Sequence, residues 1–159
     1  MPAAAALICL VIAIADGDTL TARCEAANGM ENIKVRLAEI DAPEKGQAFG
    51  ARSKQHLAEL CFQKQATVTP RAKDRYLRTV ANVECEGVDV GTEQVRSGMA
   101  WVFDRYVTDR SLYAVQDDAR SAKRGLWTNP NPTPPWEWRN GERRQGAPSV
   151  TSLPERSTP

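Results

Sequence analysis

Histidine and closely spaced cysteines are scarce in this chain. His56 is the single histidine among 159 residues, and the four cysteines include no C-x-x-C pair. Because protein zinc sites are built from cysteine and histidine ligands at short spacings, the composition argues against a zinc site. We expect His56, beside Leu57 on a predicted helix, to be an ordinary surface or boundary residue.

The chain also lacks an excess of charge of either sign. Its 21 Lys and Arg residues are balanced by 20 Asp and Glu residues, which gives a formal net charge of +1. A strongly basic balance is the usual electrostatic sign of a nucleic-acid-binding protein. Any prediction of nucleic-acid binding must therefore rest on local clusters of basic residues.

Long apolar runs are missing, apart from residues 2–15, PAAAALICLVIAIA. This run is too short to span a bilayer as a helix. It also lacks the basic region that opens a secretory signal. We therefore expect a buried first strand that begins near Leu7, and no association with a membrane.

The four cysteines are an even set of widely spaced residues: Cys9, Cys24, Cys61 and Cys85. Two disulfides in an oxidising compartment are one interpretation, and three connectivities are then compatible with the sequence. Four buried free thiols are the alternative, because cysteine is often fully buried in its own right. We favour disulfides and take Cys9–Cys24 and Cys61–Cys85 as the working pairing.

Hydrophobic periodicity predicts an α+β fold that is mainly β. The expected elements, in order, are strands at 7–15, 19–26 and 31–41, a helix at 50–64, strands at 66–70 and 78–85, a short helix at 88–98, a short strand at 99–103 and a helix at 111–125. Three antiparallel strands followed by a helix and further strands are typical of a small OB-type barrel. We predict a five-stranded OB-type β-barrel with about three α-helices.

Composition divides the chain into three parts. The barrel domain is expected at residues 7–127. The Pro- and Trp-rich segment 128–139 should dock on the barrel, because large exposed indoles are unfavourable. Residues 140–159 are polar and rich in Gly, Pro and Ser, which is typical of a disordered tail.

Two aspartates are candidates for a metal site. Asp18 follows the Asp16-Gly17 turn signal at the start of the second strand, and Asp41 ends the third strand. Neighbouring antiparallel strands run in opposite directions, so these two side chains can converge at one edge of the sheet. Two carboxylates with a main-chain carbonyl and waters make an oxygen-only site that suits Ca²⁺. An EF-hand is excluded, because the twelfth position of such a loop would be Ala27.

Charged residues beside this site fit a phosphate-bearing substrate. Arg36 lies five residues before Asp41 on the same predicted strand. A guanidinium stays charged and binds phosphate oxygens in a bidentate fork. Glu44 follows a rigid proline and would lie near the metal without being a ligand, where a base for a water is needed. A solvated strand end is the simpler interpretation of the same residues.

A second basic cluster occupies the stretch RAKDRYLRT at residues 71–79. Basic side chains with an interleaved aromatic, here Tyr76, are the local pattern for binding a nucleic-acid backbone and stacking a base. Taken alone, a short basic run is more often a solvated loop.

The motifs DGDT, VRLAEIDAPE, DRYLRT, VRSGMAWVFDRY and RGLW occur in an order and at spacings that resemble the thermonuclease family, the staphylococcal nuclease-like calcium-dependent nucleases. The resemblance runs from about Cys9 to Trp127. The cysteines and the closing PPWEWR resemble the exported, plasmid-borne bacterial branch, which implies a periplasmic or secreted protein, although no signal peptide is evident in this chain.

The resemblance implies a calcium site and a base region. Asp18 and Asp41 match the family's calcium carboxylates, and Ala42 takes the position whose backbone carbonyl completes the set. Since only that carbonyl is used, alanine should be tolerated. Glu44 matches the glutamate proposed to activate or orient the attacking water.

The resemblance also implies substrate contacts. Arg36 and Arg78 match the two arginines that hold the scissile phosphate. Tyr76 and Tyr106 match positions that contact the nucleotide, and Arg75 stands where a lysine is usual.

Two positions depart from the family pattern. The usual glycine of the DRYGR motif is Leu77 in this chain, which should affect the loop that presents Arg78. A family tyrosine falls on Asp104, which affects sugar or base contacts on that side.

The sequence as a whole predicts a calcium-dependent endonuclease that hydrolyses DNA and RNA as a monomer, with little sequence preference, and leaves 3′-phosphate ends. One alternative is a non-catalytic OB-type nucleic-acid-binding module. Another is an extracellular domain with purely structural Ca²⁺, which would explain the aspartates but not the two arginines aimed at the same place.

Overall fold

The strands close into a five-stranded barrel, as the sequence predicts. The computed structural model describes residues 5–146. The strands follow one another around the barrel in the order β3 (Gly29–Leu37), β2 (Thr19–Ala26), β1 (Leu7–Asp16), β5 (Gln65–Lys73) and β6 (Thr79–Cys85). These neighbours are antiparallel, and a parallel pairing of β3 with β6, in which Val35 lies opposite Thr79, closes the barrel.

The strand predicted at residues 31–41 is wrong in one respect, because the structure breaks it in two. β3 ends at Leu37, and the short β4 (Ile40–Asp41) leaves the barrel to pair with β8 (Trp101–Val102). Between them Glu39 has a left-handed backbone with φ 71°. This break turns Asp41 out of the β3 ladder.

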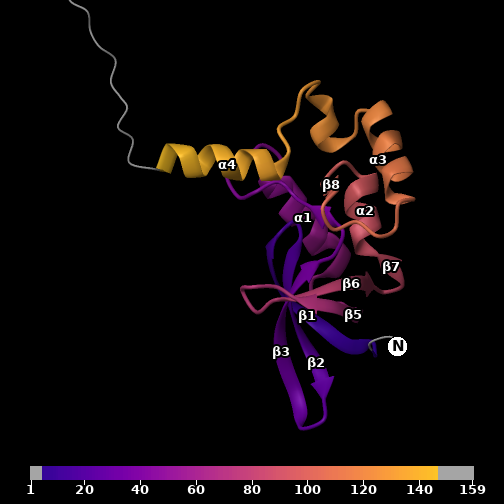
Figure 1. Cartoon of the computed structure of the whole chain (residues 1–159). Helices are drawn as coiled ribbons and strands as arrows, with labels where there is room; N and C mark the ends of the chain where they lie inside the picture. The colour runs from indigo at the N-terminus through magenta and orange to yellow at the C-terminus, as the bar shows by residue number, and fades with distance from the viewer. Residues whose placement is uncertain (1–4, 147–159) are drawn as a thin grey trace, which may run out of the picture.

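The helices gather at one end of the barrel (Figure 1). They are α1 (Gly50–Cys61), α2 (Val90–Arg96), α3 (Leu112–Ser121), the short 3₁₀ helix η1 (Gly125–Thr128) and α4 (Pro135–Gly146), and a two-residue strand, β7 (Val88–Asp89), leads into α2. None of the helices within residues 5–146 is long and apolar enough to cross a membrane.

Helix α4 is the longest element that the sequence-based prediction missed; the prediction also lacked η1 and included β7 in a helix. The segment 128–139 was expected only to dock on the barrel, with no helix in it. Pro135 stands at the first helical position, where a missing N–H costs no hydrogen bond. The helix runs to Gly146, so the segment expected to be a tail from residue 140 begins as a helix. The rest of that expected tail, 147–159, lies outside the described residues.

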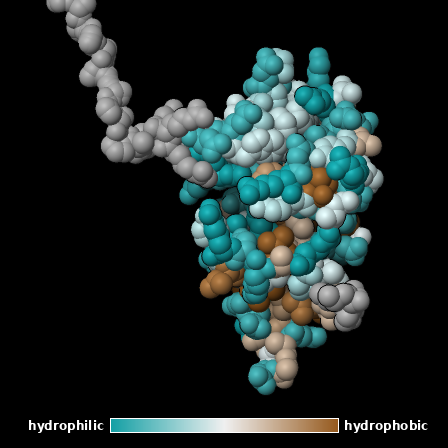
Figure 2. Space-filling view, viewed as in Figure 1, coloured by the Kyte–Doolittle hydropathy of each residue, from teal (hydrophilic) through white to brown (hydrophobic). Residues whose placement is uncertain are grey.

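The core lies inside the barrel and under α1. Alternate residues of each strand point inward, and α1 adds Leu57 to them, fully buried. Figure 2 shows mostly hydrophilic side chains over the helical half of one face, with hydrophobic residues gathered over the strands. Most of the buried hydrophobic residues form one contiguous core, to which the barrel strands and α1 contribute.

Both expected disulfides form. Cys9 and Cys24 lie directly opposite each other on β1 and β2 and are bonded. Cys61, at the end of α1, is bonded to Cys85, at the end of β6. The structure therefore confirms the disulfide interpretation and both pairings.

The two disulfides should contribute differently to stability. The double change Cys61→Ala/Cys85→Ala should lower the free energy of unfolding by about 3 kcal/mol, because the bond closes a 24-residue separation and ties α1 to the barrel. Cys9→Ala/Cys24→Ala should cost less, since hydrogen bonds already hold those strands in register. Urea unfolding of both variants measures this, and equal losses would contradict the expectation.

Candidate active site

Asp18 and Asp41 lie together where the β1–β2 turn meets β4. A carboxylate oxygen of Asp18, Oδ2, accepts a hydrogen bond of 2.8 Å from the backbone N–H of Ala42. The two side chains are nearly inaccessible to solvent, with Asp18 7% and Asp41 1% exposed. Buried carboxylates need positive charge nearby, and here they sit side by side at one edge of the barrel.

Arg36 supplies part of that charge. Its guanidinium lies 3.5 Å from Asp18 Oδ2 and 3.4 Å from Asp41 Oδ1. It also donates to the backbone carbonyls of Leu37, at 2.7 Å, and Ile40, at 2.9 Å. The same arginine therefore balances both aspartates and satisfies the carbonyls exposed by the break between β3 and β4.

The turn that carries Asp18 depends on close packing against α1. A Cβ on Gly17 would lie 1.8 Å from Ser53 Oγ, so the position requires glycine because of this approach. The Gly17 carbonyl accepts a 2.7 Å hydrogen bond from the side chain of Gln94, which is fully buried on α2. The sequence indicated the turn at Asp16-Gly17, but Gln94 carried no signal, because nothing in its local pattern relates it to residue 17.

Arg139 is a second guanidinium at the site, and the sequence-based prediction missed it. It comes from α4 and donates to both oxygens of Asp41, at 3.1 and 2.8 Å, and to Glu44 Oε1 at 2.5 Å. These contacts raise the pKa of Arg139 further, so it stays charged. Arg139 is 98 positions from Asp41 in sequence, so no local spacing could indicate the pairing.

The acidic side chains differ in how firmly they are ionised. Burial disfavours the charge of Asp18, but Arg36 and hydrogen bonds from neighbours hold its pKa below the usual range. Burial raises the pKa of Asp41, against the hydrogen bonds from Arg139. Burial and the adjacent Asp18 raise the pKa of Asp16 to about 7. Asp16 therefore belongs to the site electrostatically, although the sequence indicated only its turn.

Arg78 reaches the same edge from the β5–β6 loop. Its Nη1 lies 3.5 Å from Thr19 Oγ1, and that hydroxyl donates to Asp18 Oδ1 at 3.0 Å. Asp74 positions the arginine through a 2.7 Å hydrogen bond from Nε. Leu77 stands where the family motif has a glycine, and its backbone has φ 66°. A leucine therefore adopts the left-handed conformation that a glycine would take without strain.

The predicted nucleotide contacts lie on two exposed surfaces. Tyr76, which is 65% exposed, stands under the guanidinium groups of Arg75, at 5.0 Å, and Arg78, at 5.5 Å from its ring centre. Tyr106 is 59% exposed and packs edge-on against Phe103, with ring centres 5.1 Å apart. The structure thus brings Arg75 and Tyr76 next to Arg78, and it places Tyr106 beside the α4 side of the site.

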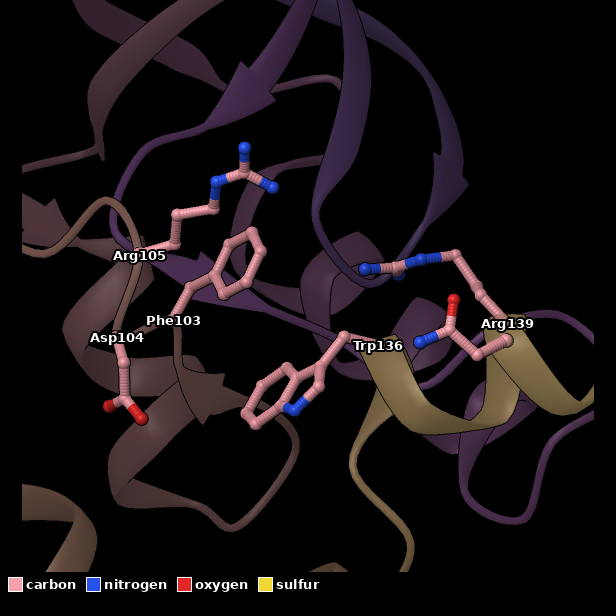
Figure 3. A pocket seen from close by; sticks show the side chains of 6 residues that line it. Phe103, Asp104, Arg105, Trp136 and Arg139 are labelled. Carbon is pink, nitrogen blue, oxygen red and sulfur yellow. The ribbon is translucent and has the colours of Figure 1, made fainter.

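A cavity of about 430 Å³ opens between the β8–α3 loop and α4 (Figure 3). Its lining residues are Phe103, Asp104, Arg105, Trp136, Arg139 and Asn140. The rings of Phe103 and Trp136 are stacked, with centres 5.5 Å apart. Asp104, which stands where the family has a tyrosine, points away from these rings in Figure 3. Its carboxylate accepts a hydrogen bond from the Tyr113 hydroxyl.

The donor set fits a hard divalent cation. Asp18 and Asp41 offer only oxygen atoms as ligands. The Arg139 guanidinium binds between Asp41 and Glu44, so a positive charge is favourable at this position. Within residues 5–146, no cluster of three or more His, Cys, Asp or Glu side chains has metal-binding geometry. A cation here would therefore need main-chain oxygen or water in addition to the two aspartates.

The closed barrel, with this edge of buried carboxylates and arginines, defines an OB-type barrel protein that carries a charged site at one edge of the sheet. The chain belongs to the family of staphylococcal nuclease homologues, whose family model matches residues 34–129. The resemblance indicated by the sequence motifs is therefore confirmed.

Curated relatives agree with this family. An "Uncharacterized endonuclease" of Haemophilus influenzae is 44% identical over 135 residues, covering 85% of this chain and 74% of the relative. A "Micrococcal nuclease" of Shigella flexneri is 38% identical over 144 residues, covering 84% and 80%. A "Probable staphylococcal-like nuclease CAN1" of Oryza sativa is 34% identical over 113 residues, covering 71% of this chain and 34% of the relative.

Proposed function

We propose that this protein is a calcium-dependent endonuclease that hydrolyses phosphodiester bonds in DNA and RNA. Membership of the nuclease family supports a hydrolytic nuclease with a nucleic-acid substrate. The observation that carries the finer proposal is the cluster at one edge of the barrel, in which the buried Asp18 and Asp41 meet the Arg36 guanidinium and the partly exposed Glu44 lies beside Asp41 through Arg139.

Asp18 and Asp41 are the residues that would hold the calcium ion, together with the Ala42 carbonyl. A bound Ca²⁺ would act as a Lewis acid toward a phosphate oxygen and help to position water. The residues of the chain prepare this site, because Arg36 and the Ala42 N–H keep Asp18 ionised and fixed in place.

Glu44 is the residue proposed to accept or orient the proton of the attacking water. Its side chain is 32% exposed, whereas that of Asp41 is 1% exposed, so water can reach it. It also shares Arg139 with Asp41, which places it beside the proposed metal carboxylates. General-base assistance of this kind typically contributes roughly 10²–10⁴-fold in rate.

Arg36 and Arg78 are proposed to stabilise charge on the phosphate oxygens. They reach the site from different strands, Arg36 from β3 and Arg78 from the loop before β6, and each has a link to Asp18. Preorganised guanidinium groups stabilise the charge that develops in the transition state. With water attacking phosphorus, the bond to the 5′ oxygen would break and leave a 3′-phosphate end.

Low sequence preference follows from the kinds of side chain proposed to hold the substrate. Arg75, Tyr76 and Tyr106 offer charge and ring faces, which bind backbone phosphate and stack on any base. The two disulfides support an oxidising compartment, and we propose the periplasm or the exterior as the place of action, with the protein acting as a monomer.

Cleavage of end-labelled single-stranded DNA and RNA oligonucleotides tests this function. Purified protein should cut both with Ca²⁺, and a chelator should abolish cleavage. The fragments should carry 3′-phosphate, which phosphatase treatment removes with a measurable mass change. Asp41→Asn, prepared in parallel, should lose at least about 100-fold in rate, because a proposed metal carboxylate is gone. This variant also controls for a contaminating nuclease.

Other outcomes would change the proposal. Cleavage that persists with chelator would contradict the calcium requirement. Salt-sensitive binding of DNA without any cleavage would instead favour a non-catalytic OB-type binding module. Metal-dependent stability with neither cleavage nor binding would favour a purely structural calcium site.

A further inference from the structure

Helix α4 lies beyond the residues that the family model matches. The family model ends at residue 129, whereas α4 begins at Pro135. Its Arg139 nevertheless makes three hydrogen bonds to Asp41 and Glu44, inside the site that the family region builds. An element beyond the region matched by the family model thus contributes a charge to that site.

The contacts of α4 show that Arg139 is held in place by its surroundings. Trp136, one turn earlier, stacks on Phe103 and packs edge-on against Trp101, with ring centres 5.6 Å apart. The Thr133 carbonyl, just before the helix, accepts a 2.7 Å hydrogen bond from Gln47. Figure 3 shows Arg139 projecting from α4 toward the strands. The start of α4 is therefore anchored on the body of the protein, and its arginine is directed at the site.

Arg139 and a divalent cation need the same oxygen atoms. The guanidinium is bonded to both carboxylate oxygens of Asp41, and the proposed metal site depends on that carboxylate. Two cations within a few ångströms of each other repel strongly where solvent screening is weak, and Asp41 is 1% exposed. A cation that binds Asp41 must therefore weaken or break the pairing with Arg139.

We propose that Arg139 is a built-in counter-ion that competes with the divalent cation for Asp41 and so sets the cation concentration at which the site fills. The proposal rests on the proposed calcium site. In the absence of the cation, Arg139 neutralises Asp41 and Glu44. When the cation binds, the guanidinium gives up Asp41, and the open cavity that it lines with Arg105 offers it room.

Calcium titration by isothermal calorimetry, without nucleic acid, tests the competition. Arg139→Gln should bind Ca²⁺ about tenfold more tightly than the wild type, because no guanidinium has to be displaced. Arg139→Lys should fall between the two, since one ammonium group cannot bond both Asp41 oxygens and Glu44 at once. Arg105→Gln removes the same charge from the same cavity and should shift the affinity much less.

A second measurement separates competition from a merely structural role. In chelator, Arg139→Gln should unfold at a lower temperature than the wild type, because buried Asp41 loses a partner. Added Ca²⁺ should then raise its melting temperature by more than it raises that of the wild type. A residue that only shaped the site would, when lost, weaken calcium binding instead.

The possible failures are distinguishable. If Arg139→Gln and Arg139→Lys bind Ca²⁺ with wild-type or weaker affinity, the competition is refuted and the proposed calcium site stands. If the wild type and both variants bind no Ca²⁺, the calcium site fails, and the competition fails with it. If Arg105→Gln tightens binding as much as Arg139→Gln, general charge is responsible and the specific role of Arg139 is refuted.

Discussion

Replacing Glu44 with glutamine should lower kcat on single-stranded DNA by roughly 10²–10⁴-fold, the range typical for loss of a general base. The change keeps the shape of the side chain and removes its ability to accept a proton. Glu44 lies beside Asp41 and shares Arg139 with it, but it is partly open to solvent, as a residue that handles water must be. Initial rates at saturating substrate and calcium measure the effect.

Glu39 provides the matched control for this experiment. Its carboxylate accepts hydrogen bonds from the N–H groups of Thr108 and Asp109, the Thr108 hydroxyl and Asn82, at 2.6–3.3 Å. Burial alone would raise its pKa, but these donors lower it. Glu39→Gln should therefore cost about 1–3 kcal/mol of unfolding free energy, while the rate per folded molecule stays near that of the wild type.

The comparison of the two glutamates decides what Glu44 does. A Glu44→Gln protein that is folded and cleaves at the wild-type rate would remove Glu44 from the mechanism. A loss of activity that follows the loss of stability equally in both variants would point to a structural role for each.

Replacing Arg36 with alanine should be the most damaging change to the site as a whole. The guanidinium lies between Asp18 and Asp41 and satisfies two backbone carbonyls. Removing one partner from a buried ionic group typically costs about 3–5 kcal/mol, because the other charge is left buried without compensation. Loss of a transition-state donor should also lower kcat by about 10²–10³-fold. Urea unfolding in chelator and single-stranded DNA cleavage measure the two effects.

Arg78→Ala separates the two consequences. The Arg78 side chain is 28% exposed and pairs with Asp74 within its own loop. Its loss should cost only about 1 kcal/mol of stability, as partly exposed ion pairs do. The loss of activity should nevertheless be as large as for Arg36→Ala. Equal stability losses for the two arginines, or full activity in either variant, would contradict these assignments.

Much of the fold was determined by the sequence alone. Period-two alternation of apolar residues in the third strand predicted its buried face, and the turn signal at Asp16-Gly17 placed the hairpin between the first two strands. The first strand was expected to be buried as a whole, but its Ile8, Leu10 and Ile12 are exposed. Because pairing in a hairpin is a local matter, these signals were also enough to predict that Asp18, Arg36 and Asp41 share one edge of the sheet. The barrel and both disulfides agree with the sequence-based prediction.

Other features depended on contacts between distant segments. The residues around Glu39 have the pattern of a continuous strand, but Glu39 accepts hydrogen bonds from residues 108 and 109, which anchor the loop at the break with φ 71°. Likewise, the Pro- and Trp-rich composition before and within α4 did not indicate a helix. Packing of Trp136 on Phe103 positions this helix, and nothing in the sequence around Arg139 connects it to Asp41. Periodicity and turn chemistry reach only a few residues along the chain, so charges that meet across 98 positions are decided by the tertiary structure.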